Sequence, residues 1–359
     1  MQKRFMGFKI LSINPGGGST KVALYEDAQA LIVEVIRHSQ QDLSHLKKTI
    51  DQLNYRRDLV LKFLERNHIK IEELSAVVGR GGPFKALPSG TYYVNQRMLE
   101  DVKLGNVQAD HVSNLGCLIA SELAKGTVPA FIVDPVSVDE FPPIARISGL
   151  PELPRKSLSH ALNIKMVARK AALEIDRKYE ELNLIIVHLG TGISVTSHLK
   201  GQMIDVNNAN DGGPLSPQRV GNLPVTGLAK LCLSGKYTYP DIYDKLTKKG
   251  GLLAHLGTDD VEEIEKRIDK GDEKARLVYQ AMVYQIAKEI GAMATTLYGK
   301  VDAIVLTGGI AHSERLVNLI KERVKFLSSV LVFPGEDEME ALTLGALRVL
   351  SGEEKAKEY

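Results

Sequence analysis

The sequence has few cysteines and no excess of either charge. Cys117 and Cys232 are its two cysteines in 359 residues. Neither belongs to a Cys-x-x-Cys pair, which excludes a zinc ribbon or a thioredoxin-like motif and fits a reducing cytoplasm. Lys and Arg number 46 against 44 Asp and Glu, a formal net charge of +2. This balance calls for neither a nucleic-acid nor a membrane partner, and favours small molecules as partners.

Long apolar runs and several catalytic signatures are also missing. No window approaches 18 uncharged apolar residues, so no membrane span is expected. The motifs His-Glu-x-x-His, Gly-x-Ser-x-Gly and His-Arg-Asp do not occur, which argues against a zinc hydrolase, a serine hydrolase and a protein kinase. The hydrophobic share of 44% and the charged share of 25% are ordinary for a folded protein. A chain of this length most readily forms two domains.

Short apolar runs alternate with helical patterns along the chain. The runs are β-branched and bounded by Gly, Pro or Asp, which is typical of buried strands. The predicted strands are residues 9–13, 74–78, 130–133, 184–189, 303–306 and 330–333. The predicted helices are residues 58–67, 111–124, 159–178, 275–298, 313–327 and 339–350. The alternation predicts an α/β fold with mixed sheets.

Two segments of the chain repeat one order of elements. Residues 10–27 contain a strand, a glycine-rich turn and an alternating strand, and residues 185–204 repeat that order before Gly201 turns the chain into a third strand. The repetition predicts two similar domains, each opening with a β-hairpin. A proline cluster within 142–154 is the candidate crossing between them. The helix at 339–350 could return to the first domain.

The first glycine-rich turn is a candidate anion site. Residues 14–21 read Asn-Pro-Gly-Gly-Gly-Ser-Thr-Lys. Three glycines expose backbone N–H groups to a ligand and the polar side chains add contacts. The candidate binding residues are Asn14, Gly16, Gly17, Gly18, Ser19 and Lys21. The spacing is not that of a Walker A motif, and a plain hairpin turn is the alternative.

Two further glycine-rich segments strengthen this interpretation. Gly190, Thr191 and Gly192 form the turn of the second hairpin, and paired turns could hold a polyphosphate from both sides. Gly308, Gly309 and Ile310 follow a predicted strand, at the end where nucleotides bind in open α/β sheets. An ordinary strand-to-helix turn is the alternative for this third segment.

Two arginines and one aspartate lie in loops rather than on helix faces. Arg80 sits among glycines and Arg219 among Pro, Gln and Gly, where a planar, permanently charged fork suits a carboxylate or phosphoryl group. Solvated surface charge is the alternative for each. Asp134 follows the strand at 130–133 and could act at its carboxyl end or cap a turn.

The motifs and their order resemble the acetate and sugar kinase, Hsp70 and actin superfamily, and within it the acetokinase family, over nearly the whole chain. The particular segments are 78–84, 131–136, 145–151 and 334–341, which are similar to the butyrate kinases of that family rather than its acetate kinases. The resemblance implies two duplicated actin-like (ribonuclease H-like) domains with an interdomain nucleotide cleft. It assigns residues 1–158 plus 338–359 to an N-terminal domain and 159–337 to a C-terminal, nucleotide-binding one.

The resemblance also implies the reaction and its participants. ATP and Mg²⁺ would bind, and a short carboxylate such as butyrate would take the γ-phosphoryl group to give an acyl phosphate and ADP. Asn14 and Glu338 would lie near the metal, with Asp337 almost as good a match as Glu338. His188 would belong to the second phosphate loop, and the family favours a homodimer or an assembly of dimers.

The catalytic set implied by the resemblance is Arg80, Asp134, Arg219 and His160. Arg80 and Arg219 would hold the carboxylate and the transferring phosphoryl group, and Asp134 would be the active-site acid. Acetate kinases have two histidines four residues apart; this chain keeps only His160 and has Lys156 at the first position. Lys156 and His160 are therefore both candidates to replace the transition-state histidine.

The chemistry agrees with these assignments. A carboxylate nucleophile is ionised at pH 7, so no strong base is needed, and phosphoryl transfer requires alignment and positive charge. A kinase of another short or branched acid, such as propionate or isobutyrate, is the first alternative. A sugar kinase is the second, but it would need a base for its hydroxyl nucleophile. A nucleotide-binding structural or regulatory protein is the third.

Overall fold

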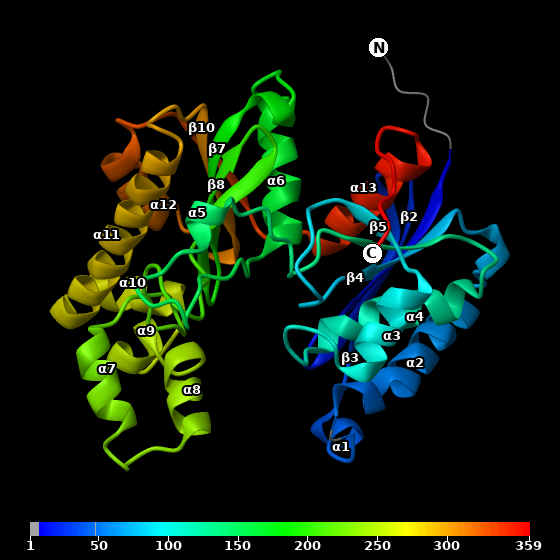
Figure 1. The fold of residues 1–359 in the computed structure, drawn as a ribbon, viewed down its shortest axis with the longest axis horizontal. Coiled ribbons are helices and arrows are strands. Elements are labelled where there is room, and N and C mark those ends of the chain that lie inside the picture. The colour runs from blue at the N-terminus through cyan, green and yellow to red at the C-terminus, as the bar shows by residue number, and fades with distance from the viewer. Residues whose placement is uncertain (1–6, 47) are drawn as a thin grey trace. The chain divides into compact units, whose positions relative to one another are not determined.

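The computed structural model describes residues 7–46 and 48–359, whose contacts divide the chain into two compact units (Figure 1). Unit 1 comprises Met1–Asp139, Ala161–Asn163 and Asp337–Tyr359, and unit 2 comprises Glu140–His160 and Ile164–Glu336. Unit 2 thus begins before the predicted boundary at 158/159. The reason is local: Glu140 accepts a hydrogen bond from Lys165 Nζ at 2.7 Å, and Arg155 pairs with Asp205.

Unit 1 contains a six-stranded mixed sheet with the order β3-β2-β1-β4-β6-β5. Its strands are β1 (Lys9–Pro15), β2 (Ser19–Glu26), β3 (Gln29–Arg37), β4 (Ala76–Arg80), β5 (Thr91–Tyr93) and β6 (Ala130–Val133). The first three strands form an antiparallel meander, while β4 lies parallel to β1 and β6 parallel to β4. The carboxyl ends of β1, β4 and β6 therefore share one edge of the sheet.

Helices cover both faces of this sheet (Figure 1). The helices of unit 1 are α1 (Gln40–Leu43), α2 (Leu53–Arg66), α3 (Gln96–Leu104), α4 (Leu115–Ala124) and α13 (Glu338–Leu350). Helix α4, with α2 and α3 beside it, packs on one face of the sheet, and α13 packs on the other. Side chains alternate along β1: Leu11 and Ile13 belong to the core with α2 and α4, whereas the Ser12 hydroxyl lies 2.7 Å from that of Thr343 on α13. The C-terminal helix therefore packs on the first sheet, as its apolar face predicts.

Unit 2 contains a five-stranded sheet with the order β11-β10-β7-β8-β9. Its strands are β7 (Asn183–Leu189), β8 (Ile193–Leu199), β9 (Gln202–Val206), β10 (Ala303–Gly308) and β11 (Val330–Pro334). Its helices are α5 (Pro143–Arg146), α6 (Ala161–Glu174, first turn in unit 1), α7 (Val225–Cys232), α8 (Tyr239–Thr247), α9 (Gly251–Leu256), α10 (Val261–Asp269), α11 (Glu273–Thr296) and α12 (Glu314–Val324). The main core joins β7, β8 and β10 to α11 and α12.

The two sheets are versions of one another. In each, an antiparallel meander of three strands is followed by a parallel strand beside the first one, and then by a second parallel strand. Gly16–Gly18 connects β1 to β2, and Gly190–Gly192 spans the corresponding turn between β7 and β8. The duplication and the α/β class predicted from the sequence are confirmed.

A close backbone approach fixes the end of β4. A Cβ on Gly79 would lie far inside van der Waals contact of the Gly116 carbonyl in α4, and one on Gly116 would collide with the Arg80 carbonyl. Both positions therefore require glycine. The contact seats the strand end that carries Arg80 directly on α4.

Gly79→Ala is expected to destabilise unit 1 by about 1–3 kcal/mol, because neither backbone can move without displacing buried neighbours. The urea midpoint, followed by circular dichroism, measures the effect. Gly291→Ala in α11 is the matched control, since its Cβ meets nothing within 4 Å and alanine is the better helix former. An unchanged midpoint for Gly79→Ala would contradict the close approach.

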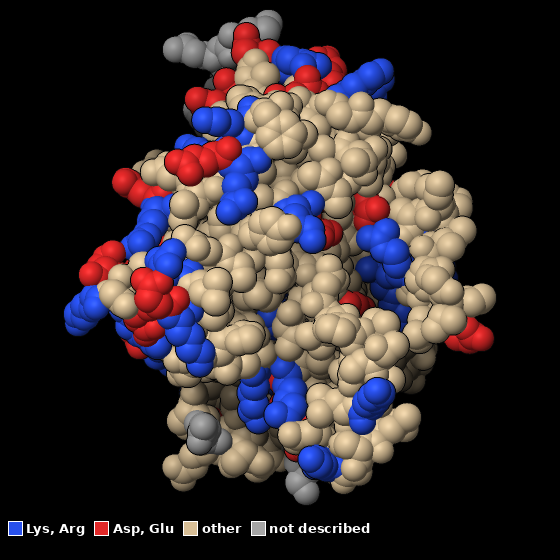
Figure 2. All heavy atoms as spheres, turned by 90° about the vertical axis from the view of Figure 1, so that its left-hand side faces the viewer, with Lys and Arg blue, Asp and Glu red and all other residues tan. Residues whose placement is uncertain are grey.

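Charged side chains of both signs lie interspersed on the face of the molecule shown in Figure 2, with broad uncharged areas around them. This agrees with the nearly balanced composition of the chain. Within residues 7–46 and 48–359, no helix is long and apolar enough to cross a membrane.

Candidate active site

The first glycine turn presents an open backbone surface in unit 1. Gly17 and Gly18 are exposed, and a Cβ on either would meet nothing within 4 Å. Neither has the positive φ that would itself favour glycine. The two glycines thus leave the outer side of the turn uncovered, and a loop that binds a ligand through its backbone needs such an open side. Asn14 is buried at one end of the turn, and Lys21 is exposed beyond Ser19 at the other.

Three predicted residues from distant parts of the chain meet beside this turn. Arg80, at the end of β4, forms a close ion pair with Glu338 at the start of α13. Asn14 Nδ2 donates to the second carboxylate oxygen of Glu338 at 2.6 Å. Burial alone would raise the pKa of Glu338, but the Arg80 charge and the hydrogen bonds from Arg80 and Asn14 outweigh it and lower that pKa. Glu338 is therefore ionised at neutral pH.

Asp134 lies one residue past β6 and is buried. Its φ of 36° places it in the left-handed region, which is uncommon for a residue other than glycine. Its Oδ1 accepts a hydrogen bond from Gly90 N at 2.7 Å, and its own N–H donates to Gly90 O at 3.0 Å. The strained backbone is thus held in place by a reciprocal pair of bonds, as at many functional positions.

The side chain of Arg219 packs against Gly192 in the second glycine turn. A Cβ on Gly192 would lie 2.7 Å from Arg219 Nε, so glycine is required for the guanidinium to pack there. Arg219 donates a short hydrogen bond to Asn210 Oδ1, and its N–H donates to Ser216 Oγ at 3.1 Å. Burial lowers the pKa of Arg219, yet a guanidinium stays protonated in proteins. Within residues 7–46 and 48–359 this charge faces no carboxylate.

Two predicted histidines stack beside the same turn. The rings of His160 and His188 lie 3.8 Å apart between centroids, at an interplanar angle of 9°. His160 Nδ1 lies 3.0 Å from Ser194 Oγ, and His188 Nε2 lies 3.1 Å from Glu336 Oε1. The stack therefore joins the segment before α6 to the end of β7 and to the segment before α13. Lys156, the other candidate, is exposed.

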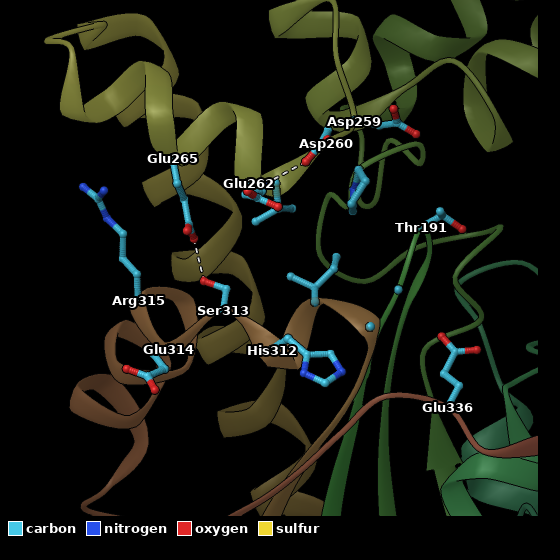
Figure 3. Close-up of a pocket in the computed structure, with 15 residues that line it drawn as sticks. Thr191, Asp259, Asp260, Glu262, Glu265, His312, Ser313, Glu314, Arg315 and Glu336 are labelled. Carbon is cyan, nitrogen blue, oxygen red and sulfur yellow. Dashed lines mark hydrogen bonds between the residues drawn. The ribbon is translucent and has the colours of Figure 1, made fainter.

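A pocket of about 840 Å³ opens beside the second turn in unit 2 (Figure 3). Gly190, Thr191, Gly309 and Ile310 line it, so it brings the second and third glycine segments together. Gly308, with φ of 93°, could not carry a side chain, because a Cβ would collide with the Leu189 backbone. Six carboxylates also line the pocket: Asp259, Asp260, Glu262, Glu265, Glu314 and Glu336.

The carboxylates surround the pocket from several elements. Figure 3 shows Glu265 and Arg315 across the pocket from Thr191 and Glu336. Glu265 accepts a hydrogen bond from Ser313 at 2.5 Å. Such a lining suits a neutral ligand with hydroxyl and amino donors far better than a bare phosphate, which it would repel.

Sequence reasoning missed three residues at these sites. Arg56 contacts the first glycine turn from inside the fold, Asn210 holds Arg219, and Glu336 contacts His188. Arg56 lies just before the helix predicted at 58–67 and next to a second arginine, so nothing in the sequence marks it. Glu336 lies inside the segment 334–341, one residue before Asp337 and two before Glu338, the two residues matched to the metal.

The duplicated sheets and their paired glycine turns define an actin-like (ribonuclease H-like) α/β protein. The chain belongs to the acetokinase family, whose model matches residues 153–342. It is 50% identical over 354 residues to Butyrate kinase 1 of Clostridium acetobutylicum, covering 98% of this chain and 99% of that protein. It is also 50% identical to Butyrate kinase 2 of the same organism over 356 residues, 99% of this chain and 100% of the relative.

A solved structure agrees in fold. The crystal structure of Porphyromonas gingivalis acetate kinase matches with a TM-score of 0.79 and 20% identity, covering 96% of this chain and 100% of that one. At this identity the likeness supports the fold alone.

Proposed function

We propose that this chain is a carboxylate kinase that transfers the γ-phosphoryl group of ATP reversibly to butyrate, giving butyryl phosphate and ADP. The observation that carries the proposal is the 50% identity, over nearly the whole of both chains, to two proteins named butyrate kinase. A kinase that prefers another short or branched acid is the alternative, because one methylene in an apolar pocket changes binding by only about 1–3 kcal/mol.

The adenosine of ATP is proposed to occupy the acidic pocket of unit 2. Ribose hydroxyls and an adenine amino group are donors, and the pocket offers carboxylate acceptors. Thr191, Gly309 and Ile310 also line the pocket, and they are proposed to lie beside the polyphosphate. The second glycine turn, in the same unit, is proposed to provide N–H groups for the phosphates, as glycine loops do in other nucleotide sites.

Magnesium fits this chain as an ion carried by the nucleotide. Among the described residues, no group of three or more His, Cys, Asp and Glu side chains could hold a metal by itself. Mg²⁺ commonly keeps several waters and binds through one or two carboxylates plus substrate phosphates. Glu338, with Asn14 beside it, supplies one ionised carboxylate of that kind. The bound ion would neutralise phosphate charge during transfer.

The protein groups proposed to act on the reacting atoms are mainly cationic. Arg219 would stabilise charge on the transferring phosphoryl group, and Arg80, held by Glu338, would hold the carboxylate. The acid is ionised at pH 7, so Asp134 is proposed to orient an arginine or a metal-bound water instead of removing a proton. His160, stacked on His188, is proposed to assist the phosphoryl transfer.

The test is acyl hydroxamate formation with Mg-ATP, hydroxylamine and acids from acetate to valerate, including isobutyrate, with ADP release measured in parallel. We expect product to peak at four carbons and ADP to appear only with acid. A peak at isobutyrate or propionate would favour the alternative acid. ADP release without hydroxamate would contradict the assignment as a carboxylate kinase. Phosphorylation of a sugar would support a sugar kinase instead.

A homo-oligomer and a cytoplasmic location are part of the proposal. The apolar helix α7 has no buried residue, and Val225 and Leu231 on it are exposed, as is Leu233 just beyond it. Such a helix favours a protein partner, and a second copy is proposed. Both cysteines are free, Cys117 buried and Cys232 exposed, which fits a reducing compartment.

A further inference from the structure

Arg56 is the largest fully buried side chain of the described protein. It stands in the first turn of α2 and points at the back of the Gly16–Gly18 turn. Its guanidinium donates to Gly17 O at 3.3 Å, Ser19 O at 3.1 Å and Thr20 Oγ1 at 2.9 Å. The first glycine turn therefore rests on a buried cation.

Every partner of this guanidinium is neutral. Gln52 Oε1 accepts from Arg56 Nε at 3.0 Å and from one terminal nitrogen at 2.9 Å. His38 Nε2 lies 3.0 Å from the other terminal nitrogen. Burial and then the Arg56 charge lower the pKa of His38 to about 4, so this imidazole is neutral at pH 7. Across the described ranges, Arg56 makes no ion pair with an Asp or Glu.

A buried arginine without a counter-charge needs a reason, because buried charges are ordinarily paired. Burial lowers the pKa of Arg56 to about 10, so it keeps its proton at neutral pH despite its surroundings. The fold thus holds one positive charge directly beneath a turn whose outer side is open.

The contacts also set the direction of the peptides in the turn. Gly17 O and Ser19 O accept from Arg56, and Gly18 O accepts from His38 N at 2.9 Å, so all three carbonyls are engaged by the protein. In a planar trans peptide the N–H points opposite to the C=O. The N–H of Gly18 therefore points away from Arg56, and it has no acceptor among the described residues.

We propose that Arg56 is a positioning residue whose uncompensated charge, together with its grip on the carbonyls of Gly17 and Ser19, makes the first glycine turn a polyphosphate site, with the bound anion as its counter-charge. The inference rests on the proposed function in taking this turn as a phosphate loop. It adds the residue that gives the loop its charge and its shape.

Gln52→Glu is the decisive variant, because it places a carboxylate where Arg56 already donates twice. The internal ion pair is expected to raise the melting temperature of the free protein. It is also expected to raise the Kd for inorganic tripolyphosphate at least about tenfold, since the cation is then already paired. Gln29→Glu adds the same charge at an exposed site in unit 1 and should leave the Kd unchanged.

Binding is measured by calorimetry with sodium tripolyphosphate, and the melting temperature is recorded with and without it. Arg56→Met is expected to weaken binding and shrink the anion-induced rise in melting temperature, whereas Arg66→Met on the same helix should do neither. A structural role alone would lower the melting temperature of Arg56→Met equally with and without the anion.

An unchanged Kd in Gln52→Glu, or no saturable tripolyphosphate binding by the wild-type protein, would overturn the inference. If Arg56→Met does not fold, Gln52→Glu decides alone. Wild-type protein that binds tripolyphosphate but forms no acyl hydroxamate from any acid would defeat the proposed function and leave the role of Arg56 standing.

Discussion

Arg219→Ala is expected to lower kcat for butyryl phosphate formation by about a thousandfold or more, while the Kd for ATP changes less than about threefold. An arginine that meets charge developing on a transferring phosphoryl group contributes roughly 10³–10⁵ to the rate of GTP-hydrolysing enzymes. Arg219 has the required features. Its guanidinium packs on the Gly190–Gly192 turn, is held by the neutral Asn210, and faces no carboxylate among the described residues. Arg219 does not line the acidic pocket that is proposed to hold the adenosine.

The hydroxamate assay and a calorimetric ATP titration measure the two quantities. Arg219→Lys keeps a charge but loses the planar fork, and should recover only part of the rate. Arg276→Ala is the control, because that exposed arginine pairs with Glu273 on the surface of α11. Near-normal turnover in Arg219→Ala would remove it from the catalytic set.

The strands and the duplication could be predicted because buried parallel strands leave a local signal. The run at 130–133 matches β6, and the runs at 9–13 and 330–333 fall inside β1 and β11. The strand predicted at 74–78 is displaced, since β4 spans Ala76–Arg80. The local sequence predicts a turn at Gly79, but this residue belongs to β4, where its backbone packs against Gly116.

The helix ends were harder to predict. Helix α2 begins at Leu53, before the predicted start at residue 58, and its N-cap Gln52 makes no side-chain cap. With no capping signal, the sequence offers no mark for the true start. Helix α6 ends at Glu174, short of residue 178.

Site residues could be predicted where a loop motif carries them, and not where only the fold brings them together. Arg80 stands out among glycines. Its partner Glu338 lies 258 residues away, and only the packing of α13 on the first sheet joins them. Arg56 and Arg57 are adjacent in one helix, yet one is buried under the glycine turn and the other pairs with Glu122. Which of two neighbouring arginines points inward depends on tertiary packing, which no local pattern records.

Glu338→Gln is expected to destabilise unit 1 by about 3 kcal/mol at pH 7 and to lower butyryl phosphate formation strongly. The substitution keeps the shape of the side chain but leaves Arg80, whose side chain is 10% exposed, without its counter-charge. It also leaves the Nδ2 of Asn14 without its ionised acceptor. Both effects displace groups proposed to hold the carboxylate and the metal, so activity and stability should fall together.

The pH dependence of stability distinguishes the loss of the Glu338–Arg80 ion pair from a loss of packing in Glu338→Gln. The folded-state pKa of Glu338 is lowered, so its stabilising effect is fully present above its unfolded pKa of about 4.5 and is lost as the pH falls through the folded value. The gap in urea midpoint between wild type and Glu338→Gln should therefore be large at pH 7 and shrink well below pH 4.5. Glu65→Gln, at an exposed position on α2, should show no such gap. A gap that stays constant down to pH 3 would mean that the carboxylate's charge contributes nothing, and that Arg80 is held by shape alone.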